Sequence, residues 1–270
     1  MSDITQDGWE IVRFHGNERL TMEEEVVEEF PLTILLNGEE FATLVCSPTN
    51  LEELIIGFLA SEGIIRFYNE IKNMVLDVNL GFAYIELNRE INFSEQDHSK
   101  RFIGSCCGKS RQFYFKSDVK TAKTITSRLT ISVEQCYNLM KELQLRSEQF
   151  RRTGGVHNAG LATPDGLLEV RTDIGRHNAL DKVYGTVLQR KIALADKLIV
   201  FSGRISSEVL LKVSKIGVGL ILSKSAPTDL ALNLATDLGI TVIGFARGNK
   251  MNVYTHPYRI QEVNMDTCQK

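Results

Sequence analysis

Two adjacent cysteines, Cys106 and Cys107, lie in the glycine-containing stretch GSCCGKS. Arg101, Lys109 and Arg111 are close in sequence, and cationic neighbours favour the thiolate, which is the nucleophilic form of cysteine. Adjacent Cα atoms are about 3.8 Å apart, below the usual disulfide range of about 4.4–6.8 Å, so a bond between the two would be strained. We predict a reactive thiol. Metal ligation is the main alternative, but zinc needs further ligands at suitable spacing and none stands nearby in sequence.

The ending Gly-Lys-Ser of the same stretch is also typical of a phosphate-binding loop. Such a loop needs a glycine, four residues and then Gly-Lys-Ser, but Ile103 occupies the position of the first glycine and Gly104 comes one residue late. The following RQFYF has strand-like character where a phosphate-binding helix should begin. Spacing and context both argue against a phosphate loop.

Two histidines occur in similar surroundings, His157 in TGGVHNAG and His177 in DIGRHNALDK. Glycines and charged residues close to them could orient a ligand or a thiol. Histidine serves equally well as a satisfied structural residue. The sequence leaves both roles open.

The composition describes an ordinary globular chain. Its 270 residues are 43% hydrophobic, and 31 basic against 34 acidic residues leave a net charge of −3, so no overall field attracts nucleic acid or an anionic membrane. The N-terminal sequence lacks a signal-peptide pattern and no apolar run approaches the roughly 18 residues of a membrane span, so we expect a cytoplasmic protein. Five irregularly spaced cysteines argue against a secreted disulfide framework; Cys46 and Cys136 stand singly in apolar runs, as buried cysteines do.

The first part of the chain predicts hairpins and one helix. Apolar residues on both sides of Asn37-Gly38 predict a hairpin with a type I′ turn, and residues 74–87 predict a second strand pair. Asn50, three residues before Glu53, predicts a capping box that opens the helix LEELIIGFLASEGII. After a charged loop from Arg89 to Lys100, we place a domain boundary near residue 120, which gives a β-rich domain 1–120 ending in the thiol loop.

The second domain, 121–270, predicts an α/β arrangement, so that the whole chain is α+β. It begins with a long helix over about 132–150. Apolar runs at 198–201, 218–222 and 240–245 alternate with two amphipathic helical patterns, which predicts parallel strands joined by right-handed crossovers. The first of these patterns contains Val209 to Ile216, and the second contains Leu230 to Leu238. An earlier helix around 180–188 should cover the same sheet.

Ligands of open parallel sheets bind beyond the carboxyl ends of the strands. Three loops should meet there, Ser202-Gly-Arg204, Ser223-Lys-Ser225-Ala-Pro227 and Ala246-Arg-Gly-Asn-Lys250. Small residues allow close backbone approach, and arginine binds phosphate in a bidentate manner. We predict a phosphate-bearing ligand at this edge; the alternative is that these are ordinary turns.

The ordered blocks EEFPLTILLNGEEFATLV, TGGVHNAGL, TDIGRHNALDKVYG, SGRISSE, SKSAPTDLA and IGFARGNKMNVYT resemble the FdhD family over nearly the whole chain. The resemblance implies a sulfurtransferase-type carrier with a cysteine persulfide intermediate. Such a carrier takes sulfur from a cysteine desulfurase and passes it to the molybdenum cofactor, bis(molybdopterin guanine dinucleotide), before the cofactor enters the catalytic subunit of formate dehydrogenase. It also implies a homodimer and a C-terminal three-layer αβα domain of cytidine deaminase type without zinc. The deaminase H-x-E and P-C-x-x-C signatures are accordingly absent from this sequence.

The resemblance places the cofactor on the stretch from Phe245 to Lys250, with GDP as a mimic of its guanine nucleotide. The candidate cofactor-binding residues are Ser202, Arg204, Ser225, His177, Phe245, Ala246, Arg247, Gly248, Asn249 and Lys250. Many family members carry Cys-x-x-Cys before the glycine, whereas this chain has Gly104 at the first position. The retained Cys-Gly-Lys therefore makes Cys107 the expected persulfide carrier and leaves the role of Cys106 open.

Two other classes of function are compatible with parts of the sequence. A cofactor chaperone would use the nucleotide site and need no thiol. A redox or metal-sensing protein would use the thiols and no guanine nucleotide. Neither explains both the thiol loop and the three-loop edge.

Overall fold

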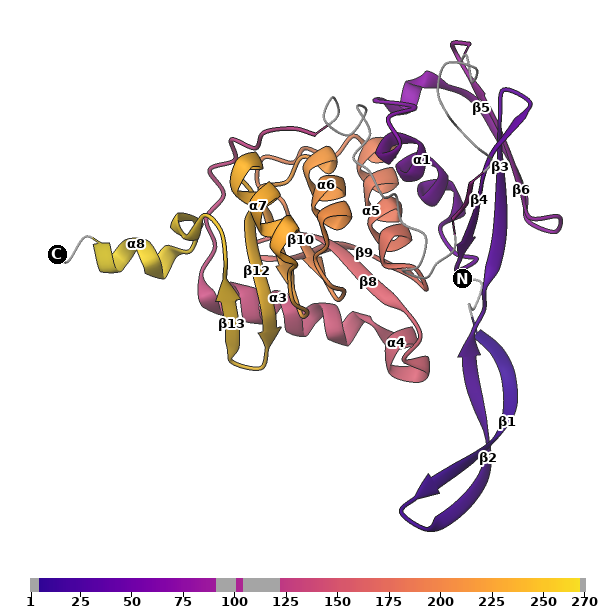
Figure 1. Ribbon diagram of the computed structural model, residues 1–270, viewed down its shortest axis with the longest axis horizontal. Helices are drawn as coiled ribbons and strands as arrows, with labels where there is room; N and C mark the ends of the chain where they lie inside the picture. Colours follow the sequence, from indigo (N-terminus) through magenta and orange to yellow (C-terminus); the bar gives the residue numbers. More distant parts are fainter. Residues whose placement is uncertain (1–4, 91–100, 104–121, 268–270) are drawn as a thin grey trace.

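The computed structural model describes residues 5–90, 101–103 and 122–267, with side chains described from 8 to 90 and from 122 to 264. These residues form a mixed α/β molecule with three sheets (Figure 1). A five-stranded sheet comes from the first part of the chain, a six-stranded sheet from the second, and a two-stranded ribbon extends away from both.

The five-stranded sheet has the order β5-β6-β3-β4-β7. Antiparallel pairs β3–β4 and β5–β6 confirm the two predicted hairpins, and β7 adds to β4 in parallel. The strands are β3 (Phe30–Leu36), β4 (Glu39–Cys46), β5 (Ile71–Asp77), β6 (Phe82–Leu87) and β7 (Arg101–Ile103), and a short 3-10 helix, η1 (Tyr68–Glu70), precedes β5.

The turn of the first hairpin was predicted correctly, whereas the start of the following helix was not. Asn37 and Gly38 both have positive φ, 52° and 89°, as a type I′ turn requires. Helix α1 (Leu51–Ser61) begins where expected, but the predicted capping box is wrong. Asn50 has φ 53° and makes no side-chain bond to the helix backbone; its amide donates to the Glu53 carboxylate at 3.2 Å instead.

The six-stranded sheet has the order β13-β12-β11-β10-β8-β9. Its centre is the predicted parallel set β10–β11–β12, whereas β8, β9 and β13 add antiparallel edges that were not predicted from the sequence. The strands are β8 (His157–Thr163), β9 (Gly166–Asp173), β10 (Leu198–Phe201), β11 (Leu220–Ser223), β12 (Thr241–Arg247) and β13 (Lys250–Val253).

Helices cover both faces of this sheet, because successive residues of each buried strand point to opposite faces. On one face, Ile199, Ile221 and Val242 pack with α5 (Arg176–Arg190), α6 (Ser207–Ile216) and α7 (Asp229–Leu238). On the other face, Val200, Leu222 and Ile243 pack against α3 (Val133–Arg146). The predicted helices are confirmed, although Leu230, which we had assigned to the packed face of α7, is exposed.

The long helix predicted over 132–150 is interrupted. Ser132 caps α3 with Gln135 in a capping box, but α3 ends at Arg146 and α4 (Glu148–Thr153) follows as a separate short helix. At the break, Ser147 has ψ 58° and its hydroxyl donates to the carbonyl of Leu143 at 2.6 Å. A hydroxyl that bonds back to a helix carbonyl competes with continuation of the helix. The chain ends in η3 (Pro257–Arg259) and α8 (Gln261–Thr267).

The two large sheets share one hydrophobic core through α1 and α5. A Cβ atom on Gly57 would lie 1.8 Å from the carbonyl oxygen of Asp181, and one on Gly185 would lie 1.9 Å from that of Glu53. The backbones of the two helices therefore touch where both residues are glycine. The predicted domain boundary near residue 120 lies outside the described residues.

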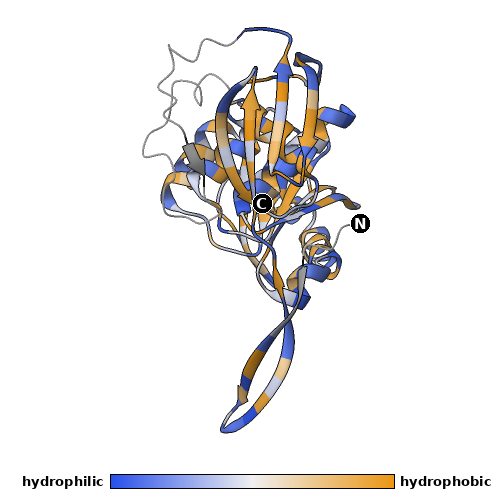
Figure 2. Cartoon of the chain, turned by 90° about the vertical axis from the view of Figure 1, so that its right-hand side faces the viewer, coloured by the Kyte–Doolittle hydropathy of each residue, from blue (hydrophilic) through white to orange (hydrophobic). Residues whose placement is uncertain are grey.

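The two-stranded ribbon, β1 (Thr5–His15) and β2 (Glu18–Val27), is here called the arm. It is joined to the rest of the molecule at the start of β3 and extends away from it, with both apolar and polar residues along its length (Figures 1 and 2). Its base touches the body where Arg152 of α4 forms an ion pair with Glu25 at 2.5 Å. Within the described parts of the chain, we find no helix with the length and apolar character to cross a membrane.

Candidate functional site

The predicted thiols, Cys106 and Cys107, lie outside the described residues, as does Gly104. Two other cysteines are buried free thiols, as predicted. Burial, with a contribution from Asp173, raises the pKa of Cys46 to about 12, and burial with Glu262 raises the pKa of Cys136 to about 12. Both therefore stay protonated at neutral pH and are poor nucleophiles.

The three predicted loops meet at the carboxyl ends of β10, β11 and β12, as expected for a parallel sheet. The Ser225 hydroxyl donates to the carbonyl of Ser202 at 3.0 Å, and the amide of Phe245 donates to the carbonyl of Ser225 at 3.2 Å. The Arg247 guanidinium donates to the carbonyl of Lys224 at 2.8 Å. These bonds fix the three loops relative to one another.

A cavity of about 630 Å³ opens beside these loops and is here called the α3–α4 cavity. Its volume is within the usual range for small-molecule sites, about 300–1,000 Å³. One wall is the second half of α3 with α4, and the other is the loop edge. The lining residues include Lys141, Leu145, Phe150, Arg151, His157, Asn158, Ser202, Lys224, Ser225 and Arg247.

The structure brings only some of the predicted cofactor-binding residues to this cavity. Ser202, Ser225 and Arg247 line it. Phe245 lies next to it, since the Arg247 guanidinium is 5.9 Å from the centre of the Phe245 ring. Ala246 is fully buried in the core beneath α3. The remaining loop residues, Arg204, Gly248, Asn249 and Lys250, are exposed and lie outside the lining, and His177 also lies outside it.

Phe245 has an unusual backbone conformation, with φ 52°. It lies in an irregular segment of β12, where the pairing with β13 shifts register between Gly244 and Arg247. A positive φ at a bulky residue is strained, and such strain is concentrated at functional sites. The bulge places the exposed Phe245 ring and the Arg247 side chain at the cavity edge.

His157 belongs to the cavity wall, a role that the sequence had left open. It begins β8, opposite Asp173 of β9. Burial lowers its pKa, Arg176 lowers it further and Asp173 partly opposes both effects. The imidazole is therefore a neutral ring at neutral pH, able to donate one hydrogen bond and accept another.

His177 lies behind this wall at the start of α5. Its Nε2 atom is 3.4 Å from a carboxylate oxygen of Glu208 without a hydrogen bond. Burial, followed by the charges of Lys212 and Arg176 and by His157, lowers its pKa to about 3. The ring is therefore neutral at neutral pH, and its contact with Glu208 is not an ion pair.

We expect His177 to make the protein less stable as the pH falls below 6.5. The unfolded state takes up a proton near pH 6.5 and the folded state only near pH 3, so between these values unfolding is favoured, by at most about 1.4 kcal/mol per pH unit. Denaturant titrations of wild type and His177→Gln from pH 7 to pH 4 would measure this. The variant should lose stability less steeply; parallel pH profiles would contradict the assignment.

Four charged residues near these histidines make structural contacts. Lys182 and Asp173 form a completely buried ion pair at 2.7 Å, and Lys212 pairs with Asp181 at 2.6 Å. Asp181 also accepts a hydrogen bond from the Ser61 hydroxyl. These groups connect α5 to its neighbours, and none of the four charged residues lines the α3–α4 cavity.

The sequence predicts a helix over residues 132–150 but not the cavity wall that α3 and α4 form. The sequence carried a partial signal, since apolar Leu145 and Phe150 stand near basic Lys141 and Arg151; the structure shows that both apolar side chains are exposed. The Phe150 ring also lies 5.9 Å from the Lys224 ammonium, which links the wall to the loop edge.

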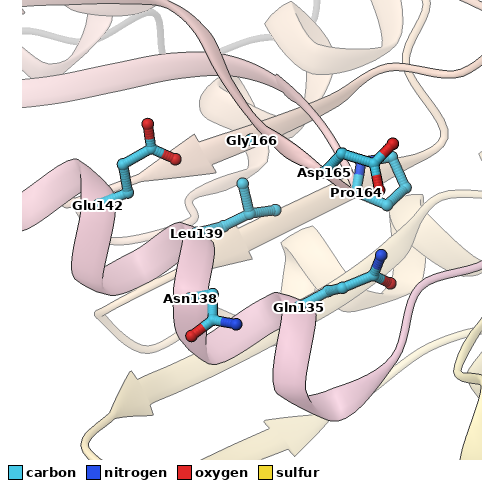
Figure 3. A pocket seen from close by; sticks show the side chains of 7 residues that line it. All are labelled: Gln135, Asn138, Leu139, Glu142, Pro164, Asp165 and Gly166. Carbon is cyan, nitrogen blue, oxygen red and sulfur yellow. The ribbon is translucent and has the colours of Figure 1, made fainter.

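A second hollow of about 250 Å³ lies between the first half of α3 and the β8–β9 turn (Figure 3). Its lining mixes polar residues with Leu139 and Pro164, and none of the predicted site residues belongs to it. Glu142 there accepts a hydrogen bond from the amide of Leu167 and pairs with Arg146, so it has a structural role. Across residues 5–90, 101–103 and 122–267, no three His, Cys, Asp or Glu side chains gather as they would around a metal.

Comparison with known proteins gives a consistent result. The model of the FdhD/NarQ family matches residues 27–261. A sulfur carrier protein FdhD of Bacillus pumilus is 62% identical over 88% of this chain and 91% of its own length, and one of Geobacillus kaustophilus is 59% identical over 93% and 95%. A solved structure described as a putative formate dehydrogenase accessory protein, from Desulfotalea psychrophila, covers 96% of this chain and all of its own at 25% identity, with a TM-score of 0.78.

Proposed function

The chain belongs to the FdhD/NarQ family, and we propose from this premise that it is a sulfur carrier required for formate dehydrogenase. The observation that carries the proposal is the extent of the match, because relatives called sulfur carrier protein align with about nine-tenths of both chains at 59–62% identity. A shared fold alone would not imply shared function, but an alignment of this length includes the loops that line the α3–α4 cavity.

The first step of the carrier reaction is a thiol exchange with a persulfide. The Cys107 thiolate attacks the outer sulfur of a persulfide on a cysteine desulfurase; a new sulfur–sulfur bond forms on Cys107, the donor bond breaks, and the donor leaves as a thiolate. The outer sulfur then passes to the molybdenum cofactor before the cofactor enters the catalytic subunit of formate dehydrogenase; the Cys107 sulfur leaves as a thiolate, and a thiol reductant supplies the two electrons that convert the transferred sulfur to sulfide. We expect this to take place in the cytoplasm on a homodimer.

The α3–α4 cavity is the site that we propose for one guanine nucleotide arm of the cofactor. Arg247 and Lys224 supply positive charge, Ser202 and Ser225 supply hydroxyls, and Phe150 supplies an apolar wall. Phosphate is well matched by a planar guanidinium, and a purine by an aromatic surface. The exposed residues Arg204, Asn249 and Lys250 would then contact parts of the cofactor that extend beyond the cavity.

The last described strand before the thiols, β7, runs toward the cavity wall. β7 runs parallel to β4, with Ile103 opposite Leu44, so β7 points in the direction in which β4 continues to Ser47. The Ser47 amide donates to Asp173, which is the register partner of His157 in the cavity wall. Cys107 is four residues after Ile103, and four residues of extended chain span at most about 14 Å.

The carrier role is tested by following sulfur. Purified wild-type protein is incubated with a cysteine desulfurase and cysteine, alkylated to trap persulfides and weighed by intact mass spectrometry. We expect a gain of one sulfur atom per chain. Formate dehydrogenase that still matures although no sulfur is ever added would overturn the proposal in favour of a cofactor chaperone.

The nucleotide site is tested with GDP as the probe. Arg247→Ala removes a charged hydrogen-bonding group, worth about 1.5–3 kcal/mol, so GDP should bind about 10- to 150-fold more weakly in calorimetry. Arg128→Ala is the matched control, because Arg128 is exposed and does not line the cavity. Equal affinities of the two variants would place the nucleotide elsewhere.

A further inference from the structure

The arm exposes more apolar surface than a two-stranded ribbon can bury by itself. Directly opposite residues share a face of the ribbon. Val12 and Phe14 therefore lie on one face with Glu10, Glu23, Thr21 and Arg19, while Trp9, Leu20 and Met22 lie on the other. Val12 is 45% and Phe14 64% exposed. Isolated two-stranded hairpins are marginally stable in water, which indicates that this face is covered when the protein functions.

The charges of the Val12 face are unbalanced. Glu10 and Glu23 are directly opposite each other, and like charges in that position are destabilising. On the opposite face, by contrast, Glu24 is neutralised by Arg13 at 2.8 Å. Arg19 lies opposite Phe14 on the same face, so the Val12 face carries two acids on one side of Val12 and one base beside Phe14. Its acidic part is complementary to a surface with bases beside apolar side chains.

The protein itself has such a surface on α3 and α4. Leu145 is 58% and Phe150 41% exposed, and Lys141 and Arg151 are exposed beside them. Neither base forms an ion pair with any residue whose side chain the structure describes. Lys141 and Leu145 are separated by one helical turn and so lie on one face of α3.

The two complementary surfaces lie on the same side of the molecule. The arm leaves the body beside α4, where Glu25 pairs with Arg152 and Val27 packs against Gly155 (Figure 1). A two-fold axis brings the same pair of surfaces together twice, each arm meeting the other copy's helices. Because the arm and the α3–α4 surface lie on the same side of each chain, the arm of each copy can reach the α3–α4 surface of the other.

We propose that the arm of one copy docks on α3 and α4 of a second copy, with the Val12 face against Leu145 and Phe150 and with Glu10 and Glu23 paired to Lys141 and Arg151. This inference deepens the homodimer of the proposed function and rests on it. Because these four helix residues also line the α3–α4 cavity, the docked arm completes the mouth of the cavity in the partner. Each nucleotide site is then built from two chains.

Reversing the charges tests this pairing. Glu10→Lys/Glu23→Lys changes only the arm, and Lys141→Glu/Arg151→Glu changes only the helices, so each variant alone would oppose like charges and should sediment as a single chain. An equimolar mixture restores opposite charges at both symmetric contacts and should sediment as a mixed dimer. Association is measured without nucleotide, so failure to bind GDP does not affect the result.

The apolar part has a matched control. Val12→Ser/Phe14→Ser should weaken association, whereas Val78→Ser/Leu80→Ser, at similarly exposed positions (49% and 67%) in the β5–β6 turn, should leave the dimer intact. A wild-type chain that sediments as a monomer would overturn both the homodimer and the docking of the arm on a second copy. The arm would then have to be covered by a different protein. Wild-type dimers whose charge-reversed variants also remain dimers would overturn the docking alone.

Discussion

Asp173→Ala is expected to lower the free energy of unfolding by about 3–5 kcal/mol, because it leaves the buried Lys182 ammonium without its counter-charge. Both side chains of the pair are fully buried and lie 2.7 Å apart. The same carboxylate accepts hydrogen bonds from the amides of Ser47 and Gly175 and from the Asn178 side chain. Since a typical domain is stable by only about 5–15 kcal/mol, a loss of this size would leave the variant close to unfolding.

Thermal and denaturant unfolding of the purified variants would measure the effect. Glu86→Ala is the control, because Glu86 forms an exposed pair with Lys72 at 3.4 Å and such pairs contribute at most about 1 kcal/mol. A double variant, Asp173→Leu/Lys182→Met, should recover part of the loss, since it removes the buried charge but leaves the two backbone amides unpaired. Equal effects of Asp173→Ala and Glu86→Ala would contradict the importance of the buried pair.

The buried pair also explains how the two large sheets are joined. Ser47 follows β4 of the first sheet, and Asp173 ends β9 of the second. The Lys182 ammonium donates to the carbonyls of Ser47 and Thr172, at 3.2 and 3.1 Å. A single charged network thus fixes the end of β4 against the start of α5. Asp173 is the register partner of His157, so we expect its loss to disturb the cavity wall as well.

The central strands could be predicted because their residues obey local rules. Leu198–Phe201 is a short apolar run followed by serine and glycine, and such a run is typical of a buried parallel strand. The Asn37-Gly38 turn was predictable for the same reason, since these two residues tolerate positive φ. Each signal is contained in a few adjacent residues.

The edge strands and the arm were not predictable from such rules. β8 and β9 contain glycine, alanine and arginine instead of a continuous apolar run, and their pairing depends on contacts between distant residues. In the arm, the acidic residues from Glu23 to Glu25 belong to strand β2, although a run of acidic residues is not typical of a strand. A ribbon without a core of its own gives no periodic burial signal.

The candidate site was predicted in part, for related reasons. Topology correctly brought Ser202, Ser225 and Arg247 together, because the ends of parallel strands share one edge of a sheet. It could not reveal that Ala246 points into the core, which depends on the alternation of side chains after the irregularity at Phe245. It also could not reveal the α3–α4 wall, which comes from helices that lie far before these loops in the chain.

Cys107→Ala is expected to abolish acceptance of sulfur from a cysteine desulfurase, whereas Cys106→Ala should retain it. Cys107 keeps the Cys-Gly-Lys context, while Gly104 replaces the first cysteine that many relatives of the family carry. A relay through a Cys-x-x-Cys pair is therefore not expected in this chain, and we propose that Cys107 carries the sulfur. Cys46 and Cys136 cannot substitute for it, because burial raises the pKa of both thiols to about 12.

Peptide mass spectrometry after alkylation distinguishes the two adjacent residues. One added sulfur should map to Cys107 in wild type and in Cys106→Ala, and no sulfur should be found on Cys107→Ala. Cys46→Ala is a useful control only if folding is verified, since this thiol packs in the core and donates to the carbonyl of Phe30. If Cys107→Ala instead gained sulfur on Cys106, the lysine and arginines of the segment would activate either thiol, and the carrier would depend on the local positive charge more than on the position of one cysteine.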